Sequence, residues 1–214
     1  FNPSGFITFA NVISANSDGV QIGGASGGAN NNVIQGNYIG TDFTGTLDLG
    51  NSDDGVDIDN AALNSQVLSN LISGNNGDGI DLGDAGASTG TIIRGNLIGT
   101  QFDGVSALGN SGRGILIGNG GTANNTIIGG TGATDGNTIA FNGWDGIRLS
   151  GTGTGNAFLG NSLYGNVEQA IDIGAQGVTP NDADDPDSGG NNLQNFPRLT
   201  LARTNGSNQL TLDG

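Results

Sequence analysis

Two stretches of the sequence match without a gap: VIQGNYIGTDFTGTLDLGNSDDGVDI at residues 33–58 and IIRGNLIGTQFDGVSALGNSGRGILI at residues 92–117. They are identical at 14 of 26 positions and lie 59 residues apart. Self-similarity at a fixed period indicates a repeat architecture, in which stacked units bury a common core. The period therefore predicts a super-repeat of two coils. We expect Phe43 and Phe102, in its loops, to fold back onto the stack.

Three short strand motifs recur along the chain. The first is Gly (once Ala), Ile or Val, a variable residue, and Ile or Leu; it starts at Gly19, Gly55, Gly79, Gly114, Gly146 and Ala170. An apolar pair follows, at Val33, Val67, Ile92, Ile127 and Phe158. The third motif begins with Asn, at Asn11, Asn37, Asn70, Asn96, Asn137 and Asn161. Gly and Asn tolerate the backbone that sharp corners need. This order predicts an all-β, right-handed parallel β-helix, a solenoid of about six coils with three short strands each.

A second Asn precedes each return to the first motif, at Asn16, Asn51, Asn75, Asn110, Asn142 and Asn166. Because coils stack about 4.8 Å apart, equivalent Asn side chains should lie above one another and hydrogen-bond as two ladders. We expect the β-helix to cover residues 1–178. Residues 179–214 begin with TPNDADDPDSGGNN and are expected to form an acidic linker or cap and the start of a following β element.

Composition supports a thin core and limits the possible partners. The chain has 43 Gly, 34% hydrophobic residues and no Cys, which excludes disulfides and Cys-based zinc sites. Its net charge of −15 disfavours nucleic acid and anionic membranes and favours cations or neutral, hydroxyl-rich ligands; plain solubility is the alternative explanation. No run of 18 apolar residues is present, so we expect no membrane insertion.

The motifs resemble the pectin-lyase-like superfamily of right-handed parallel β-helices. Within it, the blocks NLIGT, LGN and GI are similar to Gly/Asn-rich repeats of large bacterial surface or secreted proteins. The resemblance covers roughly residues 5–178 and implies a bacterial secreted or cell-surface location. Since residue 1 falls inside what reads as a coil, we also expect neighbouring domains of a longer chain. The superfamily hosts lyases, hydrolases, epimerases, tailspikes and adhesins, so the resemblance indicates fold more than function.

Acidic residues are expected to gather on one outward face. In the first strand motif the two apolar residues point inward, so the residue between them points outward. This places four carboxylates on two adjacent coils: Asp54, Asp57, Asp78 and Asp81. Asp57 and Asp81 would lie about 5 Å apart by strand spacing and could bind calcium. The alternative is structural, because Asp suits the turn before Gly.

The same face has a catalytic interpretation. NSDDGVDI and NNGDGIDL resemble the aspartate-bearing coils of polygalacturonase-type glycoside hydrolases, which use paired carboxylates. That resemblance makes Asp54, Asp57, Asp78, Asp81 and Arg113 the candidate catalytic residues. The family's Gly-His-Gly is replaced here by Gly112-Arg113-Gly114, and its later Lys is missing because the chain has no Lys. A calcium-dependent lyase would also need more basic residues than Arg113 and Arg148 supply.

Two further groups are candidate sites. Asp182, Asp184 and Asp187 have the alternating spacing of a calcium-binding loop but lack its twelfth-position Glu, so a solvated linker is the alternative. Trp144 and Arg148 are candidate ligand-binding residues, since an exposed aromatic ring beside polar groups can stack on a sugar. Packing under a loop is the alternative role for an aromatic residue, and we expect it for Tyr164.

These observations favour a non-catalytic extracellular module, a rigid spacer, adhesin or glycan-binding domain. The rival hypothesis is a polysaccharide-degrading hydrolase or lyase that uses the Asp cluster.

Overall fold

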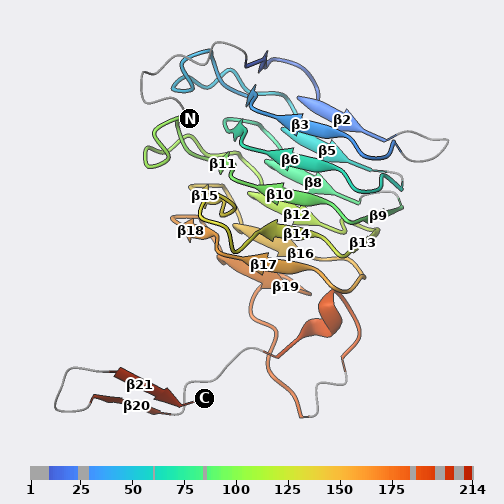
Figure 1. Ribbon diagram of the computed structural model, residues 1–214, viewed down its shortest axis with the longest axis vertical. Coiled ribbons are helices and arrows are strands. Elements are labelled where there is room, and N and C mark those ends of the chain that lie inside the picture. The colour runs from blue at the N-terminus through green and yellow to red at the C-terminus, as the bar shows by residue number, and fades with distance from the viewer. Residues whose placement is uncertain are drawn as a thin grey trace.

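The protein is a right-handed parallel β-helix (Figure 1). The computed structural model describes residues 10–23, 29–59, 61–83, 86–183, 187–195, 201–204 and 210–213. Up to residue 173, the described short strands stack into all-parallel sheets, and consecutive strands of the sequence lie in different sheets. This arrangement confirms the all-β solenoid predicted from the repeat.

Each predicted strand motif forms its own sheet. The Asn motif forms the Asn sheet: β1 (Val12–Ile13), β4 (Tyr38–Ile39), β7 (Leu71–Ile72), β11 (Leu97–Ile98), β15 (Thr138–Ala140) and β18 (Ser162–Tyr164). The Gly motif forms the Gly sheet: β2 (Val20–Ile22), β5 (Val56–Ile58), β8 (Ile80–Leu82), β12 (Ile115–Ile117), β16 (Ile147–Leu149) and β19 (Ile171–Ile173). The apolar pairs form the connecting sheet: β3 (Val33–Gln35), β6 (Gln66–Leu68), β10 (Ile92–Arg94), β14 (Ile127–Gly129) and β17 (Ala157–Leu159).

A fourth column of strands was not predicted. β9 (Ala87–Thr89) and β13 (Thr122–Asn124) pair in parallel, and single bridges extend the column from Leu63 to Thr89 and from Thr122 to Thr152. Three strands per coil is therefore an incomplete description of the central coils. These segments are rich in Ala, Ser and Thr and do not alternate apolar with polar residues. They are strands because their backbone pairs with that of the neighbouring coil, and their side chains give no pattern that predicts a strand.

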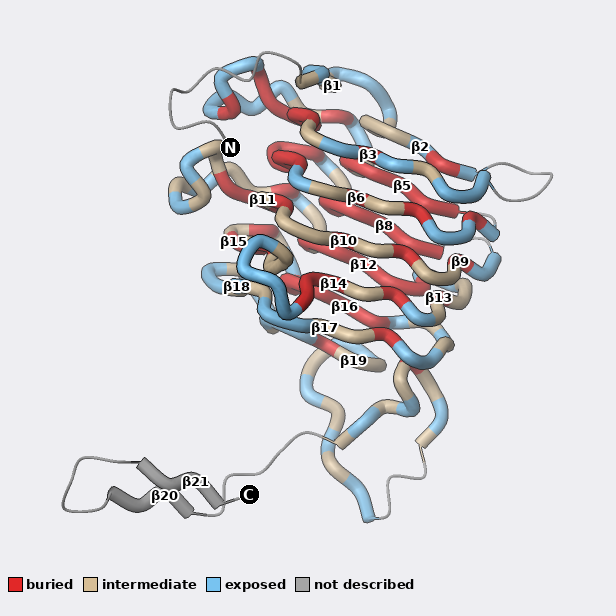
Figure 2. The backbone as a smooth tube through the Cα atoms, viewed as in Figure 1, coloured by how far each residue is buried: buried red, intermediate tan, exposed pale blue. Residues whose placement is uncertain are grey.

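The core is a narrow stack of aliphatic side chains. The buried residues follow one another from strand to strand along the stacked coils (Figure 2). Each inner strand contributes residues that are fully buried, among them Ile39, Ile58, Ile80, Ile115 and Ile147. A coil needs only a few such residues because the next coil covers them. This explains how a chain with 34% hydrophobic residues can hold a continuous core.

Both predicted Asn ladders are present through all six coils. One runs Asn11, Asn37, Asn70, Asn96, Asn137, Asn161, and each amide Nδ2 donates to the next Oδ1 at 2.7–3.0 Å. The other runs Asn16, Asn51, Asn75, Asn110, Asn142, Asn166, with distances of 2.8–3.3 Å. Most of these side chains also donate to a backbone carbonyl, so the ladders satisfy polar groups at two corners of the stack.

The loops of the super-repeat differ in packing. Each is closed by an antiparallel bridge, Thr41 with Asp48 and Thr100 with Ala107. Phe102 folds back as predicted, with its ring centroid 5.7 Å from that of Tyr38. The same prediction is wrong for Phe43, whose side chain is 74% exposed.

Beyond Gly174 the regular coils end. Asn191–Leu193 forms a short 3-10 turn, and β20 (Leu201–Thr204) pairs in antiparallel fashion with β21 (Leu210–Asp213). This antiparallel pair lies within residues 179–214, where a linker or cap and the start of a further β element were expected. Across the described residues no helix has the length and apolar character to cross a bilayer.

Candidate functional site: the aspartate face

The outward side of the Gly sheet, here called the aspartate face, carries two columns of side chains. The strand register confirms the first column: Gln21, Asp57, Asp81, Leu116, Arg148 and Asp172 are successive partners. Asp57 and Asp81 are therefore neighbours, as predicted, but they are only 7% and 3% exposed. Gln21 donates to Asp57 Oδ2 at 2.9 Å, and Asn119 donates to Asp81 Oδ2 at 3.3 Å.

The second column lies one residue before the Gly of each strand motif. Its carboxylates accept backbone N–H groups from the next coil: Asp18 from Asp54 at 3.3 Å and Asp54 from Asp78 at 2.6 Å. Asp78 accepts the N–H of Arg113 in the same way, and Asp145 accepts that of Gln169 at 3.0 Å. These bonds place the carboxylates at the turn before Gly, where Asp is favoured. The column therefore joins each coil to the next.

Opposite charges alternate along the C-terminal half of this face. Arg113 lies 3.7 Å from Asp78 and 3.9 Å from Asp145. Arg148 lies 3.6 Å from Asp145 and 2.8 Å from Asp172. Asp145, which is fully buried, stands between the two guanidinium groups. Asp145 was not among the candidates selected from the sequence; the signal that could have found it was Arg148, three residues later, together with Arg113 in the preceding coil.

The pKa of Asp54, in the second column, is strongly shifted. Burial and the nearby carboxylates of Asp78, Asp53 and Asp57 raise its pKa to about 7, although its hydrogen bond from Asp78 N–H acts in the opposite direction. The raised pKa makes Asp54 easier to protonate than an exposed Asp, and protonation lowers its repulsion with these neighbouring acids.

Besides the predicted pair of Asp57 and Asp81, a second group of acids is close enough to hold a cation. Carboxylate oxygens of Asp18, Asp53 and Asp54 all lie within 4.8 Å of one another, the spacing that one ion needs. Asp18 and Asp53 were not among the candidates selected from the sequence, although Asp18 holds in its coil the position that Asp54 holds in the next one.

The second predicted calcium loop is only partly described. Asp182 is exposed, and its backbone is clamped by Asn195, which accepts the Asp182 N–H and donates to the Asp182 carbonyl, both at 3.0 Å. Asp187 is half-buried, whereas Asp184 lies outside the described residues. The described part supplies no group of acids from this loop that is close enough to share an ion.

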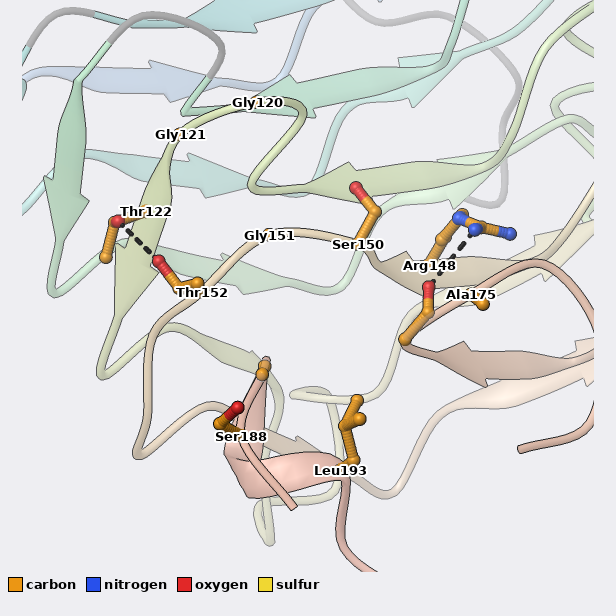
Figure 3. A pocket seen from close by; sticks show the side chains of 13 residues that line it. Gly120, Gly121, Thr122, Arg148, Ser150, Gly151, Thr152, Ala175, Ser188 and Leu193 are labelled. Atoms are coloured by element: carbon orange, nitrogen blue, oxygen red, sulfur yellow. Dashed lines mark hydrogen bonds between the residues drawn. The ribbon is translucent and has the colours of Figure 1, made fainter. Parts of the chain in front are cut away.

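The candidate ligand-binding residues occupy different surroundings. Trp144 is 39% exposed, and the Arg113 guanidinium lies over its ring, 5.3 Å from the centroid. Arg148 is 8% exposed and borders a hollow of about 650 Å³ that Trp144 does not line. Figure 3 shows Arg148 directed toward the segment at Ala175, where it donates to the Gly174 carbonyl at 3.1 Å. Tyr164 packs at a loop as predicted, donating to the Gly104 carbonyl at 2.8 Å.

The hollow beside Arg148 is lined mainly by backbone and hydroxyl groups. Its hydroxyl side chains are those of Thr122, Ser150, Thr152 and Ser188. Thr122 and Thr152 are already hydrogen-bonded to each other at 2.9 Å (Figure 3).

No protein-family model matches this chain. No curated protein and no solved structure is detectably similar to it. The repeat pattern and the geometry of the face therefore carry the functional argument alone.

Proposed function

We propose that the protein is a rigid, non-catalytic β-helix module of a bacterial secreted or cell-surface protein, related to the pectin-lyase-like superfamily. It acts as a spacer or adhesin stalk between neighbouring domains and contacts glycans weakly. One observation carries the proposal: carboxylates that a hydrolase would need are used to join coils. Asp54 and Asp78 each accept a backbone N–H from the next coil, and Asp78 also pairs with Arg113.

The glycan contact is proposed at Trp144. An indole ring that is 39% exposed offers an apolar face on which a sugar ring can stack. Arg113 fixes the ring from one side and supplies N–H donors for hydroxyl groups. The net charge of −15 favours neutral over acidic glycans.

This function predicts binding without turnover. On incubation with neutral and acidic polysaccharides the protein should release no reducing ends and no unsaturated products. Trp144→Ala should weaken binding to a responsive neutral glycan about tenfold, the effect of losing one stacked ring. Phe43→Ala is the matched control, because Phe43 is an exposed aromatic residue on the loop of another coil. Equal affinities for the two variants would remove Trp144 from the proposal.

A polysaccharide hydrolase is the second candidate, and the pKa of Asp54 favours it. A buried carboxylic acid whose pKa is raised to about 7 is suited to the role of general acid. Such an enzyme would lose activity as the pH rises through about 7, where Asp54 loses its proton. Turnover with that pH profile, abolished in Asp54→Asn while the variant stays folded, would establish the hydrolase and refute the non-catalytic module.

Calcium is proposed as a stabilising ion at Asp18, Asp53 and Asp54. It would relieve the repulsion that contributes to the raised pKa of Asp54. At about hundredfold excess over its Kd, calcium should raise the melting temperature by about 5 °C relative to chelator. Asp53→Asn should abolish that rise, and Asp48→Asn, an exposed acid in a loop, should keep it. No shift in the parent protein would exclude the ion.

A further inference from the structure

We propose that the outward face of the connecting sheet holds a binding site for one neutral sugar residue, in a hollow beside Arg94. The hollow measures about 270 Å³ and is lined by side chains of β3, β6 and β10 and by the loop that follows β14. Because pockets for larger organic ligands measure about 300–1,000 Å³, this volume suits a single ring. The inference rests on the proposed function for the class of ligand, but the hollow does not include Trp144 or Arg113.

The register of three strands gives the hollow an apolar floor and polar corners. On the outward face, Gln66 of β6 pairs with Ile92 of β10, and Leu68 with Arg94. Gln35 of β3 pairs with Leu68 from the other side. Leu68 and Ile92, which are half-buried, thus lie on a diagonal between the polar side chains. A sugar ring has the matching shape, because it presents C–H groups on its face and hydroxyl groups around its rim.

Two charged groups at one side of the hollow are held in place by the chain itself. Arg94 Nε donates to the Gly129 carbonyl at 3.0 Å. Asp135 Oδ2 accepts the Gly132 N–H at 3.0 Å, and the Asp135 carbonyl accepts the Gly95 N–H at 3.1 Å. Since these bonds fix both side chains, a ligand that binds them has little ordering to impose.

Arg94 and Asp135 leave a gap that one hydroxyl group fits. Arg94 Nη1 lies 4.0 Å from Asp135 Oδ2, which is longer than a hydrogen bond. A hydroxyl oxygen about 2.8 Å from both atoms would accept from the guanidinium and donate to the carboxylate at once. The two side chains are 37% and 28% exposed, so a ligand can reach them. Because their charges balance, the pair favours a neutral group over a charged one.

Gln35 and Gln66 supply donors and acceptors for further hydroxyl groups, since each side-chain amide offers both. Gln35 is exposed and Gln66 is half-buried, and neither amide has a hydrogen-bond partner within the described part of the chain. A purely apolar molecule would use the floor but leave these groups without a partner. The lining therefore fits a polyhydroxylated ring best.

The test is NMR titration of the isotopically labelled full chain with the methyl glycosides of glucose, galactose and mannose. For at least one glycoside, the backbone amide shifts should concentrate at Gln66, Ile92, Arg94 and Asp135, with a Kd of about 1–10 mM. If none of the three glycosides shifts these residues, the proposal is overturned.

Variants separate this site from the contact at Trp144. Arg94→Leu should weaken binding of the responsive glycoside at least about tenfold, and Gln66→Ala about threefold. Gln101→Ala, at a half-buried glutamine in a loop, is the matched control and should bind like the parent. Melting curves verify folding. Glycoside binding that is kept in Trp144→Ala and lost in Arg94→Leu supports the hollow even if polymer binding at Trp144 fails, and the reverse pattern contradicts it.

Discussion

Replacing Asn96 with Ala should lower the free energy of unfolding by about 3 kcal/mol. Asn96 is fully buried in the middle of its ladder. Its Nδ2 donates to Asn137 Oδ1 at 2.9 Å and to the Val67 carbonyl at 2.8 Å. Its Oδ1 accepts the backbone N–H of Asn70 at 2.8 Å and the Asn70 side chain at 3.0 Å. Because Ala replaces none of these, several buried polar groups lose a partner at once, each costing about 1–3 kcal/mol before relaxation.

Asn11→Ala is the matched control for this substitution. Asn11 belongs to the same ladder, but it is exposed and makes one ladder bond, to Asn37 at 2.7 Å. Water can replace that bond, so the loss should stay below about 1 kcal/mol. Urea unfolding, followed by the fluorescence of the single Trp and by circular dichroism, measures both variants. Equal losses at Asn96 and Asn11 would show that the ladder does not hold the stack together.

Much of the fold follows from residue spacing. Pairs such as Asn51 and Asn75 are 24 residues apart in sequence and adjacent in space, because one turn of the helix separates them. The longer step from Asn75 to Asn110 adds a loop without disturbing the ladder, since the loop leaves the stack and returns to the same corner. Positions that recur in this way can be assigned to columns from the order of the residues alone.

The sequence was less informative where packing depends on a partner from another coil. Phe102 contacts Tyr38, which lies 64 residues earlier in another coil, whereas Phe43, its equivalent in the repeat, is 74% exposed. The repeat makes the two Phe residues equivalent but does not specify which side chain from another coil each one meets. The strand at Thr122–Asn124 was missed for a related reason, because its pairing with Ala87–Thr89 involves backbone rather than a hydrophobic pattern.

The positions of the candidate site residues were predicted better than their chemistry. The columns containing Asp57, Asp81 and Arg148 have the predicted register. Whether a carboxylate is paired with an arginine depends on how far the side chains extend from one coil to the next. Arg113, for example, lies between Asp78 and Asp145 of the two neighbouring coils. A single sequence gives the order of charges along a column but not these distances.

The most direct test of the structural role of the aspartate face is the free energy of unfolding of Asp78→Ala. Asp78 is 7% exposed, accepts the Arg113 N–H and lies 3.7 Å from the Arg113 guanidinium. A carboxylate that joins two coils in this way should cost about 2 kcal/mol when removed. With calcium removed by chelator from both proteins, Asp53→Ala, at an exposed acid of the same patch, should change stability by less than about 0.5 kcal/mol. If Asp78→Ala were as stable as the parent or more stable, as is common when a catalytic residue is removed, the face would be a reaction site and not a scaffold.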